Sequence, residues 1–210
     1  VFAYSFPNVA NAHTSHIFVN NSNTINLVAN SWTVEFWVKP DGIYNGYNTI
    51  FAKRLVASST TSYEGYLRQG TGVVSYYNGV NYESAYRLTT NTWSHVAYVF
   101  NNGANLQIYV NGTNVYATAA VTSIAEVDAP LVLGTARGSA EGLYGKLSNF
   151  RMIKGQAIYT GNFNISTFPF QLPNNSIGPH AGATNVAASL AGNVVVLTCN
   201  DQKLQCNGNT

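Results

Sequence analysis

The chain is poor in charge. Asp, Glu, Lys and Arg make up 9% of its 210 residues, and ten basic against eight acidic side chains give a net charge of +2. The basic residues are scattered, without a run of Lys and Arg. A nucleic-acid-binding surface needs a dense cluster of cations that neutralises phosphates, and anionic membranes attract similar clusters. The composition therefore predicts neither nucleic acid nor an acidic membrane as a partner.

The chain also lacks long hydrophobic runs and has few cysteines. No apolar stretch approaches the roughly 20 residues that a membrane-spanning helix requires, so we expect no membrane insertion. The two cysteines, Cys199 and Cys206, are too few for a zinc site, which normally has four ligands. We therefore expect no cofactor.

Asn, Ser, Thr, Gly and Tyr take the place of charge, with 14 Tyr and 18 Gly. Low charge with abundant Asn and Tyr is common in proteins that work outside cells. Tyr and Asn also suit contacts with carbohydrate or protein, because they combine a flat apolar surface with hydrogen-bonding groups. The composition favours an extracellular or surface location.

Several short stretches alternate apolar and polar residues, the pattern of β-strands. In SWTVEFWVKP, residues 31–40, the side chains of Trp32, Val34, Phe36 and Val38 share one face. In WSHVAYVFNNGANLQIYVNGTNVY, residues 93–116, two Gly-containing turns separate three such stretches. Its Asn-Gly pairs suit tight hairpins because both residues tolerate positive φ. We expect three consecutive antiparallel strands here.

About a dozen such stretches and no amphipathic helical pattern predict an all-β sandwich or barrel. We predict one domain over residues 1–210, with a long surface connection at 171–193 and a C-terminal strand or hairpin at 194–206. The predicted residues between two sheets are Trp32, Phe36, Val38, Val96, Val99, Ile108, Val110, Leu131 and Phe150.

Five segments occur in an order that resembles a known family. They are WTVEFWVKPDG, TNTWSHVAYVF, LQIYVNGTNV, PLVLGTA and GKLSNFRMIKGQAIYTGNF. Together they are similar to the laminin-G-like, concanavalin A-like domains of bacteriophage and bacterial surface proteins, over roughly Val1 to Phe168. The resemblance implies an antiparallel two-sheet jelly-roll sandwich. Because that superfamily includes lectins, glucanases, adhesion modules and virion proteins, the fold alone does not decide the function.

The sequence argues against catalysis. Ser94 and His95 are neighbours on a strand, so their side chains point to opposite sides of the sheet and cannot form a nucleophile and its base. We expect His95 to be packed or hydrogen bonded within the sheet. Glycoside hydrolysis needs two carboxylates side by side, and the eight acidic residues show no such pattern on a strand. Glu35 is expected to bond a neighbouring Lys, Arg or Tyr. We predict that the protein is not an enzyme.

Calcium is the metal that such domains hold in some cases. It requires about six to eight oxygen ligands, usually with two or more carboxylates. Asp41 and Asp128 lie in turn-like stretches, but neither has acidic neighbours in the sequence. A structural role in a turn is therefore favoured over a calcium site.

Tyrosines in and beside polar turns give the best functional lead. Sugar rings present apolar faces that stack on aromatic rings, while amide and guanidinium groups bond the hydroxyls. Asn81 accompanies these tyrosines in SYYNGVNYESAYR. The predicted carbohydrate- or partner-binding residues are Tyr44, Tyr47, Tyr76, Tyr77, Asn78, Tyr82 and Arg87. The alternative is that these tyrosines cover the edges of the sandwich or a subunit contact.

Two functions follow from this sequence. The first is a non-catalytic module that binds carbohydrate or another surface receptor, displayed on a virion or cell surface. The alternative is a structural virion protein, a capsid decoration or tail component, whose surfaces contact neighbouring subunits.

A disulfide between Cys199 and Cys206 is also predicted, since residues 194–206 bring the two opposite each other if they form a hairpin, and an oxidising setting preserves such bonds.

Overall fold

The structure is a computed structural model of the chain. It describes residues 3–7, 15–55, 60–119, 121, 124–136, 141–165 and 194–199. Within these ranges, no helix has the length and apolar character needed to cross a membrane.

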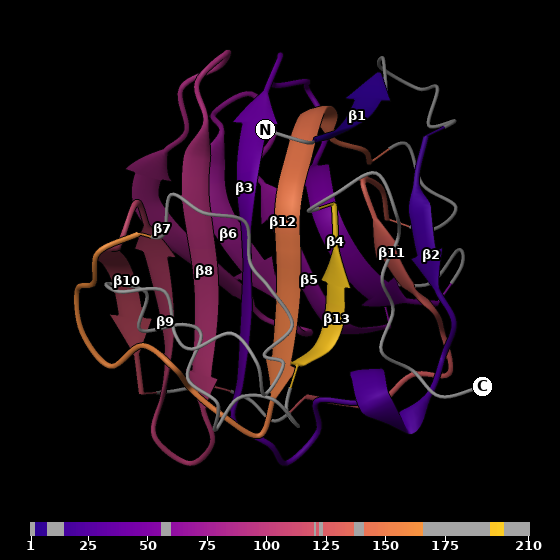
Figure 1. Ribbon diagram of the computed structural model, residues 1–210, viewed down its shortest axis with the longest axis vertical. Coiled ribbons are helices and arrows are strands. Elements are labelled where there is room, and N and C mark those ends of the chain that lie inside the picture. Colours follow the sequence, from indigo (N-terminus) through magenta and orange to yellow (C-terminus); the bar gives the residue numbers. More distant parts are fainter. Residues whose placement is uncertain are drawn as a thin grey trace, which may run out of the picture.

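Two antiparallel sheets pack face to face (Figure 1). The first sheet has the order β1 (Tyr4–Pro7), β12 (Tyr144–Lys154), β3 (Trp32–Pro40), β8 (Ser94–Asn101), β9 (Asn105–Val110), β10 (Thr113–Thr118). Its seventh strand, β13 (Val194–Thr198), pairs with the half of β12 that β1 leaves open. The last strand predicted from the sequence thus returns to the sandwich.

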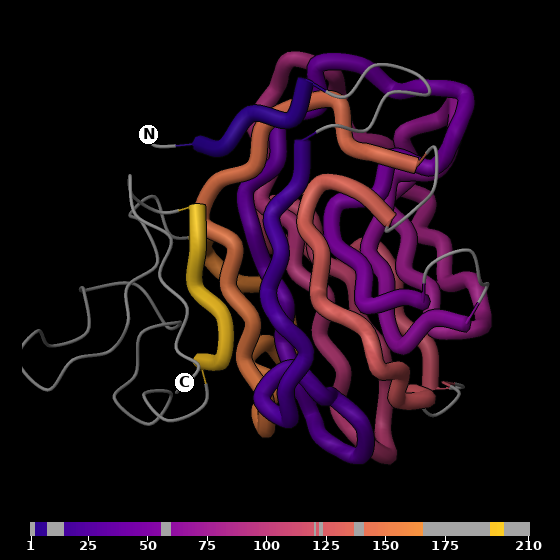
Figure 2. Tube along the Cα trace, turned by 90° about the vertical axis from the view of Figure 1, so that its right-hand side faces the viewer, coloured from indigo at the N-terminus to yellow at the C-terminus, as the bar shows by residue number. Residues whose placement is uncertain are grey.

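The second sheet contains six strands. Their order is β2 (Ile17–Val19), β11 (Leu131–Leu133), β4 (Asn48–Arg54), β5 (Thr61–Leu67), β6 (Val73–Tyr77), β7 (Asn81–Arg87). A short 3₁₀ turn, η1 (Asn23–Ile25), follows β2. Figure 2 shows the sandwich from the side, with β12 and β13 in the layer opposite β4 and β5. The predicted all-β, two-sheet jelly-roll sandwich is confirmed.

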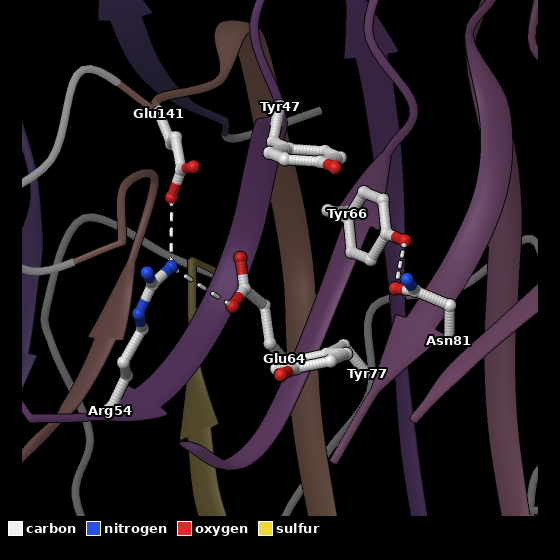
Figure 3. Close-up of a pocket in the computed structure, with 7 residues that line it drawn as sticks. All are labelled: Tyr47, Arg54, Glu64, Tyr66, Tyr77, Asn81 and Glu141. Atoms are coloured by element: carbon white, nitrogen blue, oxygen red, sulfur yellow. Dashed lines mark hydrogen bonds and ion pairs between the residues drawn. The ribbon is translucent and has the colours of Figure 1, made fainter. Parts of the chain in front are cut away.

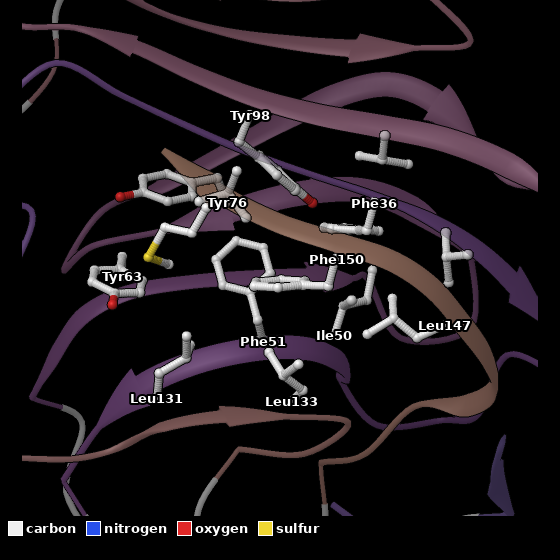
Figure 4. Packing of buried hydrophobic residues seen from close by; sticks show 14 of the residues in the cluster. Phe36, Ile50, Phe51, Tyr63, Tyr76, Tyr98, Leu131, Leu133, Leu147 and Phe150 are labelled. Atoms are coloured by element: carbon white, nitrogen blue, oxygen red, sulfur yellow. The ribbon is translucent and has the colours of Figure 1, made fainter. Parts of the chain in front are cut away.

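The core lies between the sheets and is rich in aromatic rings (Figure 4). Phe36 stacks on Phe150 with ring centroids 5.9 Å apart, and Phe51 meets both edge-on. Gly65 makes room for Phe51, because a Cβ at that position would lie 2.2 Å from the Phe51 ring. Eight of the nine residues predicted between the sheets belong to this cluster: Trp32, Phe36, Val38, Val96, Ile108, Val110, Leu131 and Phe150.

Val99 is the exception, since it is buried on the outer face of the first sheet. It follows Val96 by three positions on β8, so strand alternation places the two on opposite faces. Val99 is nevertheless buried because another part of the chain covers it. The prediction that Val99 is buried was right, but the prediction that it lies between the two sheets was wrong.

Residues 93–116 form the predicted meander, β8, β9 and β10. Asn111 and Gly112 have φ values of 49° and 78°, the positive values expected for this hairpin. Gly112 is also required sterically, because a Cβ there would lie 2.0 Å from the carbonyl oxygen of Phe163. The Phe163 amide donates to the Gly112 carbonyl at 2.9 Å.

That contact anchors residues 155–165, which we call the crossing segment. After β12, the crossing segment passes over the outer face of the first sheet, in orange in Figure 1. Tyr159 packs there against Ala97, Val99 and Tyr109. The Thr33 hydroxyl fixes the start of the segment by donating to the Gln156 carbonyl at 3.1 Å. This outer face is therefore a second buried layer.

The C-terminal predictions fall largely outside the described residues. The connection at 171–193 and Cys206 lie there, so the predicted disulfide stays a prediction. Cys199 itself is buried, and its thiol forms no disulfide within the described residues. Burial raises the pKa of this thiol to about 12, although Thr198 offsets part of the effect. Such a thiol reacts slowly, because the thiolate is the reactive form.

Candidate functional site

Two rows of side chains cross the outer face of the second sheet. In one row, strand register places Ala52 of β4, Glu64 of β5, Tyr77 of β6 and Asn81 of β7 side by side. The adjacent row is Thr49, Tyr66, Ser75 and Glu83. These residues alternate with core residues along their strands, so they point away from the core.

A cavity of about 220 Å³ opens over these rows (Figure 3). Its lining residues are Tyr47, Arg54, Glu64, Tyr66, Tyr77, Asn81 and Glu141. Four consecutive strands, the loop before β4 and the segment after β11 contribute to it. The cavity is smaller than the roughly 300–1,000 Å³ of pockets for drug-sized ligands, and its size suits one sugar ring or a similarly small group.

Glu64 forms the charged floor of the cavity. Its side chain is only 5% exposed. The Thr49 hydroxyl donates to Glu64 Oε1 at 2.7 Å, and Arg54 Nη1 lies 3.6 Å from Oε2. Burial raises the pKa of Glu64 to about 7, against the opposing effects of Thr49 and Arg54, and the nearby Glu141 adds to the increase. Near neutral pH, Glu64 therefore exists in both protonation states.

Arg54 bridges the two carboxylates of the site. Its Nη1 lies 2.8 Å from Glu141 Oε2 and 3.6 Å from Glu64 Oε2. A retaining glycosidase instead places its two carboxyl groups about 5 Å apart on either side of the scissile bond. Because a guanidinium group contacts both carboxylates here, the arrangement differs from an acid–nucleophile pair.

Tyrosine rings form the walls of the cavity. Tyr47 meets Tyr66 edge-on with ring centroids 5.1 Å apart. The Tyr66 hydroxyl donates to Asn81 Oδ1 at 2.9 Å, which fixes that ring against β7. Tyr47 is 40% exposed. The walls thus combine accessible ring surface with an amide and two carboxylates.

The structure brings only two of the predicted binding residues, Tyr47 and Tyr77, into this cavity. Tyr44 instead stacks on Tyr144 with ring centroids 5.3 Å apart. Asn78 is buried in the turn between β6 and β7, and Arg87 is exposed at the end of β7.

Tyr76 and Tyr82 cannot belong to an exposed patch, and their predicted placement was wrong. Tyr76 is fully buried and Tyr82 is 4% exposed, both in the core between the sheets. They are register partners on β6 and β7, with ring centroids 6.1 Å apart. Adjacent residues on a strand face opposite sides, so Tyr76 and Tyr77 cannot share one surface.

Sequence reasoning missed Arg54, Glu64, Tyr66 and Glu141 as site residues. A signal existed for two of them, since Glu64 and Tyr66 share a face in TSYEGYL, residues 61–67. Arg54 and Glu141 lie 87 positions apart in the sequence. Only the neighbouring positions of β4 and β11 in the sheet bring them together.

A second buried glutamate, Glu35, lies beneath the crossing segment. Arg151 Nε donates to Glu35 Oε1 at 2.9 Å, and Arg151 Nη2 contacts the same oxygen. The Tyr159 hydroxyl donates to Oε2 at 2.7 Å, and His95 Nε2 lies 3.1 Å from that atom. Burial alone raises the pKa of Glu35, but Arg151 and His95 outweigh it and lower the pKa to about 2.

The predictions for Glu35 and His95 are confirmed by these bonds. Both side chains are almost fully buried. Asp41 pairs with Lys146 at 3.0 Å, and Asp128 accepts a hydrogen bond from Asn21 at 2.6 Å. Across the described ranges, no group of three or more His, Cys, Asp or Glu side chains is arranged to hold a metal ion.

An antiparallel two-sheet sandwich is the architecture of jelly-roll domains. The chain belongs to the concanavalin A-like lectin/glucanases superfamily, whose family model matches residues 11–157. No curated protein sequence matches the chain.

Solved structures share this fold at low sequence identity. Domain 4 of an extracellular arabinanase from Geobacillus stearothermophilus, solved with arabinotriose, has 17% identity and a TM-score of 0.52, covering 67% of this chain and 66% of that one. The LG4-5 domains of mouse laminin α1 have 15% identity and a TM-score of 0.52, covering 74% and 42%. A Bacteroides ovatus protein provisionally described as carbohydrate binding has 19% identity and a TM-score of 0.54, covering 67% and 41%. The matched part of this chain therefore spans less than two thirds of each.

Proposed function

We propose that the protein is a non-catalytic module that binds carbohydrate through the cavity on the second sheet. The observation that carries this proposal is the combination of Tyr47, Tyr66 and Tyr77 with Asn81 in one small cavity. Aromatic faces stack on the apolar side of a sugar ring, and the amide and carboxylates bond its hydroxyls.

The comparisons support a binding role. The arabinanase domain was solved with arabinotriose, and the Bacteroides protein is provisionally described as carbohydrate binding. The bridging of Glu64 and Glu141 by Arg54 also favours binding over hydrolysis. Because the arabinanase is described as extracellular and both proteins concern glycans, we propose an extracellular or surface location, with a glycan or a glycosylated receptor as partner.

A glycan array tests the proposal with two matched variants. Tyr47→Ala removes a cavity wall, whereas Tyr86→Ala removes a ring of equal exposure, 40%, that does not line the cavity. Loss of one stacking ring should weaken glycan binding about five- to tenfold, equivalent to about 1 kcal/mol. Tyr86→Ala should bind like the original protein. If the original protein retains no glycan, or both variants lose binding equally, the proposal fails.

A structural role in a virion is the second candidate function. Phe18 on the edge strand β2 supports it, because this ring is 49% exposed and meets His16 edge-on at 4.4 Å. An exposed ring on a sheet edge suits contact with a neighbouring subunit. Analytical ultracentrifugation tests this candidate: association that Phe18→Ser abolishes would support it, and a monomer at all concentrations would exclude self-assembly through β2.

A further inference from the structure

Among the described residues that line it, the cavity has two acidic side chains and one basic side chain. Glu64 and Glu141 line it with one cation, Arg54, between them. When both carboxylates are ionised, one negative charge therefore has no counterpart among the lining residues. Glu83 lies in the adjacent row and is paired with Arg68, so Arg68 does not offset the negative charge of the cavity. An anionic ligand is disfavoured by this balance, and a cationic one is favoured.

Glu64 is the carboxylate best placed to bind such a ligand. Its Oε1 accepts a hydrogen bond from the Thr49 hydroxyl. Among the described residues, the cation nearest to Oε2 is Arg54 Nη1 at 3.6 Å, beyond a normal hydrogen bond. The side chain is 5% exposed, and Figure 3 shows its carboxylate pointing into the cavity. A buried carboxylate is stabilised most by a charged donor, because desolvation strengthens that contact.

The tyrosine walls suit the same kind of ligand. Tyr77 is the register partner of Glu64, so its ring stands beside the carboxylate. Tyr47 and Tyr66, whose rings meet edge-on, also line the cavity (Figure 3). Aromatic faces attract ammonium groups, and the attraction is stronger where water is excluded. A carboxylate floor with aromatic walls is thus complementary to an ammonium group.

We propose that the ligand of this cavity is a sugar bearing a protonated amino group, and that Glu64 binds the ammonium. This inference rests on the proposed function and narrows it from carbohydrate in general to amino sugars. The ring of this amino sugar would stack on the tyrosine walls, while its ammonium group donates to Glu64 Oε2.

The pH dependence follows from the groups that face Glu64. These are Thr49 and Arg54 from β4, Tyr66 from β5, Tyr77 from β6, and Glu141. Because burial raises the pKa of Glu64 to about 7, the carboxylate loses its charge in mild acid. A permanently charged ligand should therefore bind more tightly as the pH rises from 6 to 8.

Isothermal titration calorimetry at pH 7 tests the inference with sets of three sugars. Each set has one ring configuration (gluco, galacto or manno) and carries an amine, an N-acetyl group or a hydroxyl at the same carbon. We expect one amino sugar to bind at least tenfold more tightly than its two neutral counterparts. A 6-amino-6-deoxy sugar, whose primary amine stays protonated and keeps its N–H donors between pH 6 and 8, should bind more tightly at the higher pH.

Two variants distinguish direct contact between the ligand and Glu64 from a general effect of negative charge on this face of the sheet. Glu64→Gln keeps an oxygen for the Thr49 hydroxyl but removes the charge, so it should abolish the preference for the amine and leave the weak binding of neutral sugars. Glu83→Gln removes one charge on the same sheet face outside the cavity and should keep the preference. Thermal unfolding of both variants checks that they are folded.

The outcomes distinguish the two proposals. Equal affinity for amino and neutral sugars overturns this inference but leaves carbohydrate binding intact. A preference that survives Glu64→Gln also overturns it. If neither these sugars nor a glycan array shows any binding, both proposals fail.

Discussion

Glu35 and Glu64 lie on the outer faces of opposite sheets, and each is buried, yet their surroundings differ. Glu35 lies under the crossing segment and is bonded by Arg151, Tyr159 and His95. Glu64 lies at the floor of an open cavity, with one hydrogen bond from Thr49 and a longer contact to Arg54. The pKa of Glu35 is lowered to about 2, and that of Glu64 is raised to about 7.

The contrast shows how one residue type serves two purposes in one fold. A carboxylate that is surrounded by donors is stable as an anion and has no capacity for a ligand. A buried carboxylate with too few donors is costly to ionise, and that cost is relieved when a ligand supplies a donor. The covered face of the first sheet is therefore structural, and the open face of the second sheet is the candidate for binding.

The largest expected effect is on the covered face. Glu35→Gln leaves the Arg151 guanidinium buried without its carboxylate, so we expect a loss of about 3–5 kcal/mol in the free energy of unfolding. Urea unfolding at pH 7 measures it. Glu83→Gln, in an exposed pair with Arg68, is the control and should cost less than about 1 kcal/mol. Similar losses in both variants would contradict the contrast.

On the open face, the effect of replacing Glu64 on the free energy of unfolding depends on pH. A rise in pH should favour the variant over the original protein, the opposite of the loss expected for Glu35→Gln. The pKa of Glu64 is raised from 4.5 to about 7 in the folded state. The folded protein therefore holds this proton more tightly than the unfolded chain, and the resulting stability is complete below pH 4.5 and lost as the pH rises through 7. The loss is about 3 kcal/mol, at about 1.4 kcal/mol per pKa unit.

Glu64→Gln should remove this pH dependence. Urea unfolding at pH 4 and pH 8 gives the difference in unfolding free energy between the variant and the original protein. We expect this difference to shift in favour of the variant by about 3 kcal/mol between the two pH values. A difference that is the same at both would show that Glu64 titrates normally.

A smaller effect is expected from the donor above Glu35. Tyr159→Phe keeps the ring but removes the hydroxyl that donates to Glu35 Oε2 at 2.7 Å. A hydrogen bond to a charged group contributes about 1.5–3 kcal/mol, so the unfolding free energy should fall by that amount. The substitution should also raise the pKa of Glu35, and NMR titration of the Glu35 carboxyl carbon would detect this change. An unchanged titration would contradict the proposed network.

The smallest effect on stability is expected at the cavity wall. Tyr47→Ala removes a ring that is 40% exposed, so the unfolding free energy should change by less than about 1 kcal/mol. Its effect on glycan binding should exceed its effect on stability. A loss of several kcal/mol in stability would instead make Tyr47 a structural residue.

The sequence by itself determined the sandwich and much of its local structure. Alternation along residues 31–40 and 93–116 predicts which side chains of β3 and β8 share a face, and positive φ at Asn111 and Gly112 follows from their residue types. The same alternation separates Ser94 from His95, and applied to Tyr76 and Tyr77 it would have removed Tyr76 from the predicted site. These features depend on neighbours in the chain, so they are visible in the sequence.

The tertiary structure alone decided which residues meet. Arg54 reaches Glu141 because β11 pairs with β4, although 87 positions separate the two residues in the sequence. Likewise, Glu35 is covered because residues 155–165 fold over the first sheet, more than a hundred positions further along. Both glutamates occupy polar positions of apolar strands, and no local pattern distinguishes them. Which of them is covered and which stays open depends on contacts between distant segments, and those contacts set the two pKa values in opposite directions.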